Sequence, residues 1–243
     1  MINNIPKIIH YCWFGGKEKP SRIKICMNSW EKYLTEYEIK EWNESNFDIE
    51  SNDFVRHAYK EGKFAFVSDY VRVMALYNYG GIYLDTDVEV FKSFDDLLNN
   101  YSFWGFEEKN FIATSTIGAC KGNELIGIFL KSYEGKVFSM NPENGNTMTN
   151  VYEITKIMKA IGVNMDGKYQ KIEGVATIYP QEYFSPYDYI NCYSKATNNT
   201  YGMHHFYKSW LPFNDRAKSN IKKVVASLIG GKNIAKFRDI VQK

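Results

Sequence analysis

Apolar residues along the chain follow two spacings in turn, and each predicts a different element. Residues 8–13 form a short apolar run between a proline and two glycines, which is typical of a buried strand ending in a tight turn. Residues 20–34 carry apolar side chains at helical intervals, and residues 37–42 then alternate as a second strand. The pattern therefore predicts a strand–helix–strand opening.

Helix-like and strand-like segments keep alternating over the next 170 or so residues. The predicted helices are 53–79, a segment beginning at Asn123 and 151–161, and the predicted strands are 82–84, 101–106, 111–119, 176–179 and 201–206. No internal repeat, low-complexity tract or linker interrupts this alternation before residue 215. We therefore expect one α/β domain over residues 1–215, with a mixed, mostly parallel sheet.

Composition is compatible with a single large domain. The chain has 243 residues, of which 44% are hydrophobic and 24% charged, enough to bury a full core. Aromatic residues make up 16%, which suits either a tyrosine-rich core or surfaces that stack on flat rings. The four cysteines have no paired spacing, and the chain lacks a leader pattern or an apolar run of about 18 residues. We expect reduced cysteines and a cytoplasmic location.

Charge is distributed unevenly along the chain. Residues 216–243 carry eight basic side chains against one acidic one, a net charge of +7, so with a total of +2 the preceding residues carry −5. Apolar residues in this tail recur at helical spacing, which predicts a basic amphipathic helix. Such a helix either packs on the domain or contacts an anionic membrane surface, here the inner leaflet. We expect no nucleic-acid partner.

The segment Asp85-Thr86-Asp87 is the clearest candidate for chemistry. It follows a double glycine and an apolar strand, and two carboxylates in this spacing can bind one divalent cation with room left for phosphates. An EF-hand loop is excluded because Val90 occupies its glycine position. A phosphatase of the haloacid dehalogenase type has Thr or Val where this chain has Glu89.

Two further sets of polar residues accompany this pair. Asp69 and Arg72 share a face of the helix that leads into the loop, where they form either an ion pair or a site for sugar hydroxyls and a phosphate. His204 and His205 lie at a strand end, where a histidine is either a satisfied polar group or a ligand of manganese. Alternation along the strand lets only one of these two histidines face the site.

Together these motifs resemble one glycosyltransferase family. The matching segments are Ile-Pro-Lys-Ile-Ile-His-Tyr-Cys-Trp-Phe-Gly-Gly (5–16), Ser-Asp-Tyr-Val-Arg (68–72), Gly-Gly-Ile-Tyr-Leu-Asp-Thr-Asp (80–87), and His-His with Ser-Trp (204–210). The family contains bacterial capsular-polysaccharide transferases and the yeast initiating mannosyltransferase, and is distantly similar to the clostridial glucosylating toxins. The resemblance implies a GT-A fold, retention of anomeric configuration, and a Mn²⁺ or Mg²⁺ ion. It also implies a nucleotide-sugar donor, with a UDP-sugar favoured and GDP-mannose possible.

The resemblance also assigns roles to residues of this chain. Trp13 would stack on the base, Asp69 and Arg72 would hold the donor sugar and its phosphates, and Tyr83 would line the donor site. Asp87 would bind the metal directly, Asp85 through water or with the ribose, and His205 would complete the coordination. Ser209 and Trp210 would close over the diphosphate. The expected catalytic residues are thus Asp85, Asp87 and Arg72, with Asp85, Asp87 and His205 as metal ligands.

The acceptor is less well defined by the resemblance. A glycan or lipid-linked saccharide in capsular or surface polysaccharide synthesis is expected, but Gly145-Asn146-Thr147 replaces the Thr-Gly-Pro element of the family, so no acceptor residue is assigned. Because no nucleophile is evident, same-face attack is the expected route to retention. The alternatives are a non-catalytic nucleotide-sugar-binding module and an aspartate-based phosphatase.

Overall fold

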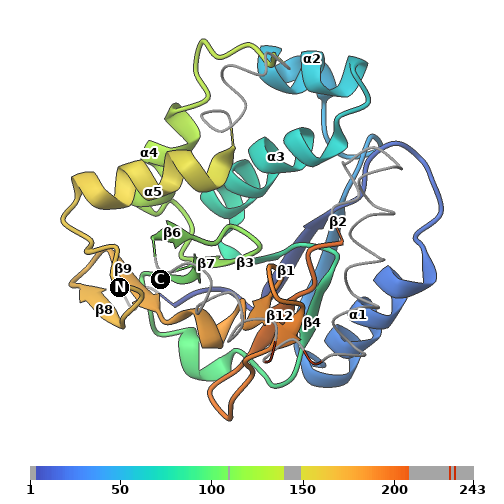
Figure 1. Ribbon diagram of the computed structural model, residues 1–243. Coiled ribbons are helices and arrows are strands. Elements are labelled where there is room, and N and C mark those ends of the chain that lie inside the picture. The colour runs from blue at the N-terminus through green and yellow to red at the C-terminus, as the bar shows by residue number, and fades with distance from the viewer. Residues whose placement is uncertain (1–3, 109, 140–148, 208–229, 231–232, 234–243) are drawn as a thin grey trace.

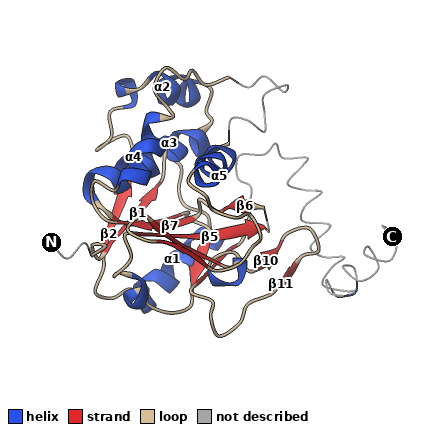
Figure 2. Ribbon diagram, turned by 90° about the vertical axis from the view of Figure 1, so that its left-hand side faces the viewer, coloured by secondary structure: helices blue, strands red, loops and turns tan. Residues whose placement is uncertain are grey.

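A central sheet with helices on both faces forms the body of the protein (Figures 1 and 2). The computed structural model describes residues 4–108, 110–139, 149–207, 230 and 233. The first half contains β1 (Ile8–Cys12), α1 (Ser21–Tyr33), β2 (Glu38–Trp42), α2 (Asp53–Lys60), α3 (Phe64–Tyr79), β3 (Gly81–Leu84) and β4 (Val88–Val90). Short 3-10 turns lie at Ile49–Ser51, Asp95–Leu97 and Gln181–Tyr183.

The second half completes the sheet and adds two small strand pairs. Its elements are β5 (Ser102–Glu108), β6 (Phe111–Ile112), β7 (Thr116–Ala119), α4 (Glu124–Lys131), α5 (Asn150–Ala160), β8 (Gln170–Ile172), β9 (Ala176–Tyr179), β10 (Tyr187–Asp188), β11 (Tyr193–Ser194) and β12 (Gly202–His204). Strand β12 pairs with β4, and β10 pairs with β11, outside the main sheet.

The main sheet has the order β2-β1-β3-β7-β5-β9-β8, with β6 added to β5. Its pairings place β1, β2, β3, β5 and β9 in one direction, whereas β6, β7 and β8 run opposite to them. The sheet is therefore mixed and mostly parallel, which confirms the α/β class expected from the alternation of elements.

The order of the first three strands places the carboxyl ends of β1 and β3 side by side at one edge of the sheet. Strand β1 lies between β2 and β3 and is parallel to both, while α1 covers one face and α3 the other (Figure 2). The chain passes from β1 through α1 to β2, and from β2 through α2 and α3 to β3, so the strand order reverses at β1. In open α/β sheets, ligands bind outside the carboxyl ends of strands at such a switch point. Here the carboxyl end of β3 leads directly into Asp85.

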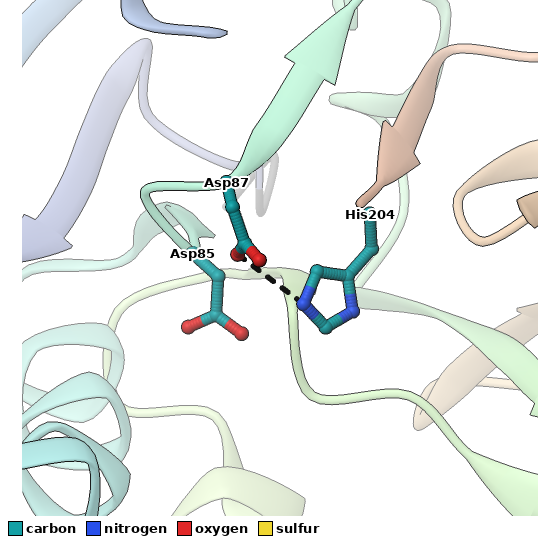
Figure 3. A group of neighbouring side chains, drawn as sticks. All are labelled: Asp85, Asp87 and His204. Atoms are coloured by element: carbon teal, nitrogen blue, oxygen red, sulfur yellow. Dashed lines mark ion pairs between the residues drawn. The ribbon is translucent and has the colours of Figure 1, made fainter. Parts of the chain in front are cut away.

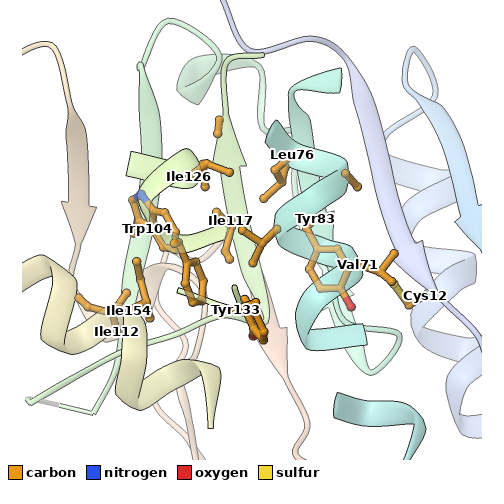
Figure 4. Close-up of a cluster of buried hydrophobic side chains, with 14 of the residues drawn as sticks. Cys12, Val71, Leu76, Tyr83, Trp104, Ile112, Ile117, Ile126, Tyr133 and Ile154 are labelled. Atoms are coloured by element: carbon orange, nitrogen blue, oxygen red, sulfur yellow. The ribbon is translucent and has the colours of Figure 1, made fainter. Parts of the chain in front are cut away.

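The core consists of one cluster on each face of the sheet. On the α3 face, Trp104 and Ile117 are fully buried against the helices (Figure 4). On the α1 face, Trp30 is fully buried and its indole N–H donates to the Val88 carbonyl at 2.8 Å. Burial of each large apolar side chain contributes about 1.5–3 kcal/mol. This packing holds β3 and β4, and with them the loop between, in a fixed position.

Some sequence expectations differ from the structure or lie beyond it. The predicted strand 111–119 is two strands, β6 and β7, each of which pairs with β5. The predicted helix 53–79 is divided into α2 and α3, because Gly62 adopts a left-handed backbone conformation with φ of 65°. The tail at 216–243 lies outside the described residues except for Gly230 and Asn233. Its helix and the domain boundary at 215 therefore stay predictions.

Candidate functional site

Three potential metal ligands converge beyond the carboxyl end of β3. One ligand atom each from Asp85, Asp87 and His204 lies within 4.8 Å of the others (Figure 3). The aspartates belong to the β3–β4 turn, and His204 ends β12, where it pairs with Val88 of β4. The short β4–β12 ladder thus brings the two parts of the group together across more than a hundred residues.

Asp87 is held by the chain segment 204–207. The His204 Nε2 atom lies 3.2 Å from Asp87 Oδ1, and the Tyr207 backbone N–H donates to Asp87 Oδ2 at 2.8 Å. Burial alone would raise the pKa of Asp87, but attraction to His204 and these hydrogen bonds lower it to about 2. Burial likewise disfavours the charged form of His204, yet Asp87 raises its pKa to about 9. Without a cation, the two groups form a buried ion pair.

Asp85 is fixed by groups of the protein on its other side. The Tyr83 hydroxyl donates to Asp85 Oδ1 at 3.1 Å, and Arg72 Nη2 lies 3.2 Å from the same oxygen. The Asp85 backbone N–H donates to the Ser115 carbonyl at 2.8 Å, which ties the turn to the start of β7. Tyr83 is only 1% exposed, so it supports Asp85 from beneath the surface.

Arg72 organises the acidic groups from a buried position. Its side chain is 5% exposed, and Nη2 also lies 2.9 Å from Asp69 Oδ1. Nη1 donates to the Thr114 carbonyl at 2.7 Å, Nε donates to the Ser68 carbonyl at 3.3 Å, and the guanidinium lies 4.6 Å from the centre of the Tyr83 ring. Burial raises the pKa of Asp69 to about 7 although Arg72 opposes the rise. Both nearby carboxylates raise the pKa of Arg72 against the effect of burial.

The structure brings His204, rather than the expected His205, to the two aspartates. His205 Nε2 lies 2.9 Å from Glu89 Oε2, and its ring stacks on Tyr207 with centroids 5.3 Å apart. The alternation rule gave the correct signal that only one histidine can face the group. The choice between them depends on the register of β12 against β4, which pairs His204 with Val88.

Trp13 lies on the loop after β1, next to a cavity of about 400 Å³. Its indole N–H donates to the Lys17 carbonyl at 2.6 Å, and its ring lines the cavity together with Lys19 and Asn43. Trp13 and Asp85 thus follow neighbouring parallel strands at the same edge of the sheet. Ser209 and Trp210 lie outside the described residues.

The residues of this group fit a divalent cation. Two carboxylates and an imidazole form a donor set that Mn²⁺ accepts, whereas Mg²⁺ prefers oxygen ligands alone. Within the described part of the chain, no other group of three His, Cys, Asp or Glu side chains has this proximity. The buried His204 Nδ1 atom has no hydrogen-bond partner there, whereas Nε2 lies 3.2 Å from Asp87 Oδ1.

Comparison with known proteins places the chain in a family. Residues 2–140 match the family model described as capsular polysaccharide synthesis protein, which covers more than half of the chain. The chain belongs to this family. The resemblance drawn from the sequence motifs is thereby confirmed. The matched region contains Asp69, Arg72, Asp85 and Asp87, but it ends before His204.

One relative and three solved structures show further likeness. Inositol phosphoceramide mannosyltransferase 3 of Schizosaccharomyces pombe (strain 972 / ATCC 24843) is 29% identical over 126 residues, which are 50% of this chain and 35% of that protein. The chain thus matches about a third of the length of this relative.

In the described part of the chain, none of the helices combines the length and apolar character that a membrane span requires.

The solved structures are all glycosyltransferases by their descriptions. The PaToxG glycosyltransferase has a TM-score of 0.48 at 17% identity, over 65% of this chain and 69% of its own. A glycosyltransferase involved in glycosylation of the major capsid of PBCV-1 has a TM-score of 0.46 at 12% identity, over 88% and 98%. The galactosyltransferase LgtC has a TM-score of 0.41 at 14% identity, over 90% and 95%.

Proposed function

We propose that this protein is a metal-dependent glycosyltransferase of the GT-A type, which moves a hexose from a nucleotide sugar to a saccharide acceptor with retention of anomeric configuration. The observation that carries the proposal is the convergence of Asp85, Asp87 and His204 within 4.8 Å at the carboxyl end of β3. Membership of the capsular polysaccharide synthesis family supports the reaction class.

In this proposal the nucleotide lies across the carboxyl ends of β1 and β3, which are neighbouring parallel strands. The Trp13 ring, beside the 400 Å³ cavity, offers a flat surface on which a base can stack. The diphosphate then reaches the group formed by Asp85, Asp87 and His204. The hexose extends toward α3, where Asp69 and Arg72 lie.

The side chains of the site stabilise charge on the leaving group. Departure of a nucleoside diphosphate builds up negative charge, and a bound divalent cation supplies the Lewis acid that neutralises it. Asp85, Asp87 and His204 would hold this cation. Tyr83 and Arg72 keep Asp85 oriented, since both contact its Oδ1 atom. Arg72 acts in this scheme by positioning carboxylates, because its donors are directed to protein groups.

Retention by same-face attack is compatible with the contacts of the carboxylates at the site. Asp69 and Asp85 both contact Arg72, and Asp87 contacts His204, so each of these carboxylates already has a charged partner. A covalent route needs a nucleophilic carboxylate beside the anomeric carbon. Mass spectrometry of the protein incubated with a donor and without acceptor should find no glycosylated peptide; a stable sugar adduct would contradict the same-face route.

The proposal also includes a donor and an acceptor. We favour a UDP-sugar, with GDP-mannose as the alternative because the S. pombe relative is named a mannosyltransferase. The acceptor in this proposal is a glycan or lipid-linked saccharide used in capsular or surface polysaccharide synthesis. The net charge of +7 at 216–243 supports contact with the anionic cytoplasmic face of the membrane.

Donor hydrolysis tests the proposed function directly. Purified protein with a panel of nucleotide sugars and Mn²⁺ should release nucleoside diphosphate slowly without acceptor, and a chelator should stop the release. Asp87→Asn should abolish the release. Asp188→Asn is the matched control, because Asp188 is similarly buried but pairs with Lys195 on the β10–β11 hairpin.

Three outcomes would replace the proposal. Full activity of Asp87→Asn in chelator would refute metal dependence. Binding of the nucleotide sugar without release of any product would indicate a non-catalytic binding module. Release of inorganic phosphate in place of nucleoside diphosphate would indicate a phosphatase.

A further inference from the structure

Several buried polar atoms without a hydrogen-bond partner lie in or near the candidate site. Six side chains in the described part of the chain have such an atom: Ser115, Thr116, Asn150, Ser185, Asn191 and His204. His204 belongs to the proposed metal group, the Ser115 carbonyl accepts from the Asp85 N–H, and Thr116 begins β7. Unsatisfied buried groups are rare in folded proteins, and each one needs a physical explanation.

Asn150 is linked to the acidic group by a short series of contacts. Arg72 contacts Asp85 through Nη2 and the Thr114 carbonyl through Nη1. The Thr114 hydroxyl in turn donates to Asn150 Oδ1 at 3.0 Å. Asn150 is therefore separated from the Arg72 guanidinium by a single residue, although it comes from the first turn of α5.

The Asn150 amide is fixed in orientation, but only its oxygen has a hydrogen-bond partner. Its Oδ1 atom accepts from Thr114, which directs the Nδ2 group away from that hydroxyl. No described residue accepts a hydrogen bond from Nδ2, and the residue is 5% exposed. An amide donor buried without an acceptor destabilises the fold on its own. A ligand that brings an acceptor would recover this loss on binding.

We propose that Asn150 Nδ2 donates a hydrogen bond to a hydroxyl oxygen of the donor hexose and so contributes to the choice of sugar. This inference rests on the proposed function, in which the hexose extends from the metal group toward Asp69 and Arg72. A hydroxyl is the matching partner because it is neutral and can accept from an amide while donating elsewhere. A site built to bond a hydroxyl discriminates strongly against a sugar that lacks it.

Binding measurements on Asn150→Asp test the proposal. Aspartate keeps the shape and the Oδ1 acceptor for Thr114 but lacks the Nδ2 donor. With Mn²⁺ present, calorimetry should show an affinity for the nucleoside diphosphate within about twofold of the wild-type protein, and an affinity for the nucleotide sugar that is about tenfold weaker. Asn150→Ala, which adds no buried charge, should show the same difference.

Deoxy analogues of the nucleotide sugar identify the bond itself. In the wild-type protein, one deoxy position should weaken binding by about tenfold, and the same analogue should cause no further loss in Asn150→Asp. Thr155→Val is the matched control, because Thr155 is equally buried on α5 but its hydroxyl accepts from the Ile112 N–H. That variant should keep the full loss caused by the deoxy position.

The outcomes separate this inference from the proposed function. A wild-type protein that binds neither nucleotide nor nucleotide sugar would refute both. A wild-type protein that binds the nucleotide sugar, with Asn150→Asp and Asn150→Ala binding it equally well, would refute the role of Asn150 alone. So would a deoxy series whose losses are the same in Asn150→Asp as in the wild-type protein.

Discussion

Replacement of Asp87 by Asn should change the pH dependence of stability in the metal-free protein. Asn keeps the volume of the side chain but removes the negative charge that lies 3.2 Å from His204 Nε2. Both side chains are about 85% buried, so solvent screens this ion pair only weakly. The wild-type protein therefore gains stability from the pair only at pH values where both partners are charged.

The size of the effect follows from the two pKa values. A His204 pKa raised from 6.5 to about 9 corresponds to roughly 3 kcal/mol, and an Asp87 pKa lowered from 3.8 to about 2 corresponds to roughly 2 kcal/mol, at about 1.4 kcal/mol per pH unit. The two values describe one ion pair and are not added. We expect the smaller value, about 2 kcal/mol, because 3.2 Å is long for a charge-assisted hydrogen bond.

The pH window is set by the direction of each change. The pKa of His204 is raised, so its contribution is complete below pH 6.5 and is lost as the pH rises through about 9. The pKa of Asp87 is lowered, so its contribution is present above pH 3.8 and is lost as the pH falls through about 2. The pair therefore stabilises the metal-free protein most between about pH 4 and 6.5.

Urea denaturation in chelator from pH 5 to 9.5 measures this contribution. The wild-type protein should lose about 2 kcal/mol of unfolding free energy, relative to Asp87→Asn, between pH 6.5 and 9.5. Contributions from other histidines are common to both proteins and cancel in the difference. Asp188→Asn should keep the wild-type dependence over this range. Parallel profiles for the wild-type protein and Asp87→Asn would refute the assignment of His204 as the partner of Asp87.

Three other predictions concern the site and the tail. His204→Ala should weaken Mn²⁺ binding at least tenfold by calorimetry, whereas His205→Ala should change it less than threefold; the reverse order would restore His205 as the ligand. Arg72→Lys should reduce donor hydrolysis about a hundredfold, because one ammonium cannot contact Asp69, Asp85 and the Thr114 carbonyl together; near wild-type rates would show that positioning by Arg72 is dispensable. Truncation after Asp215 should move the protein from the membrane to the soluble fraction on sedimentation, and an unchanged distribution would leave the tail only a structural role.

Much of the fold was predictable because each long element buries one face, and apolar residues therefore recur along it at helical or strand spacing. The helices at 21–33, 124–131 and 150–160 all lie where helical spacing placed them. Strand β4 was missed because it spans only Val88–Val90, too short for alternation to be distinguished from a loop. The small hairpin of β10 and β11 was missed for the same reason.

The candidate site was predictable in residue type more than in geometry. Asp85 and Asp87 follow a strand whose end the sequence marks clearly. The choice of His204 over His205 could not be made, because it depends on pairing with β4, a strand that the pattern did not predict. The contact of Thr114 with Asn150 spans 36 residues and depends on how α5 packs against β6. Such packing leaves no local signal in the sequence.

The pairing of β4 with β12 also has a consequence for how the protein is made. About 120 residues of synthesis complete five strands of the main sheet, β1, β2, β3, β5 and β7, with the helices between them. His204 and the Tyr207 amide, which hold Asp87, come more than 80 residues later. A nascent chain can thus carry both aspartates and still lack the residues that hold Asp87, including His204, the third ligand in the proposed function. In that case the chain would bind a cation tightly only after folding is complete. The growing polypeptide would not retain a metal ion before its substrate site has formed.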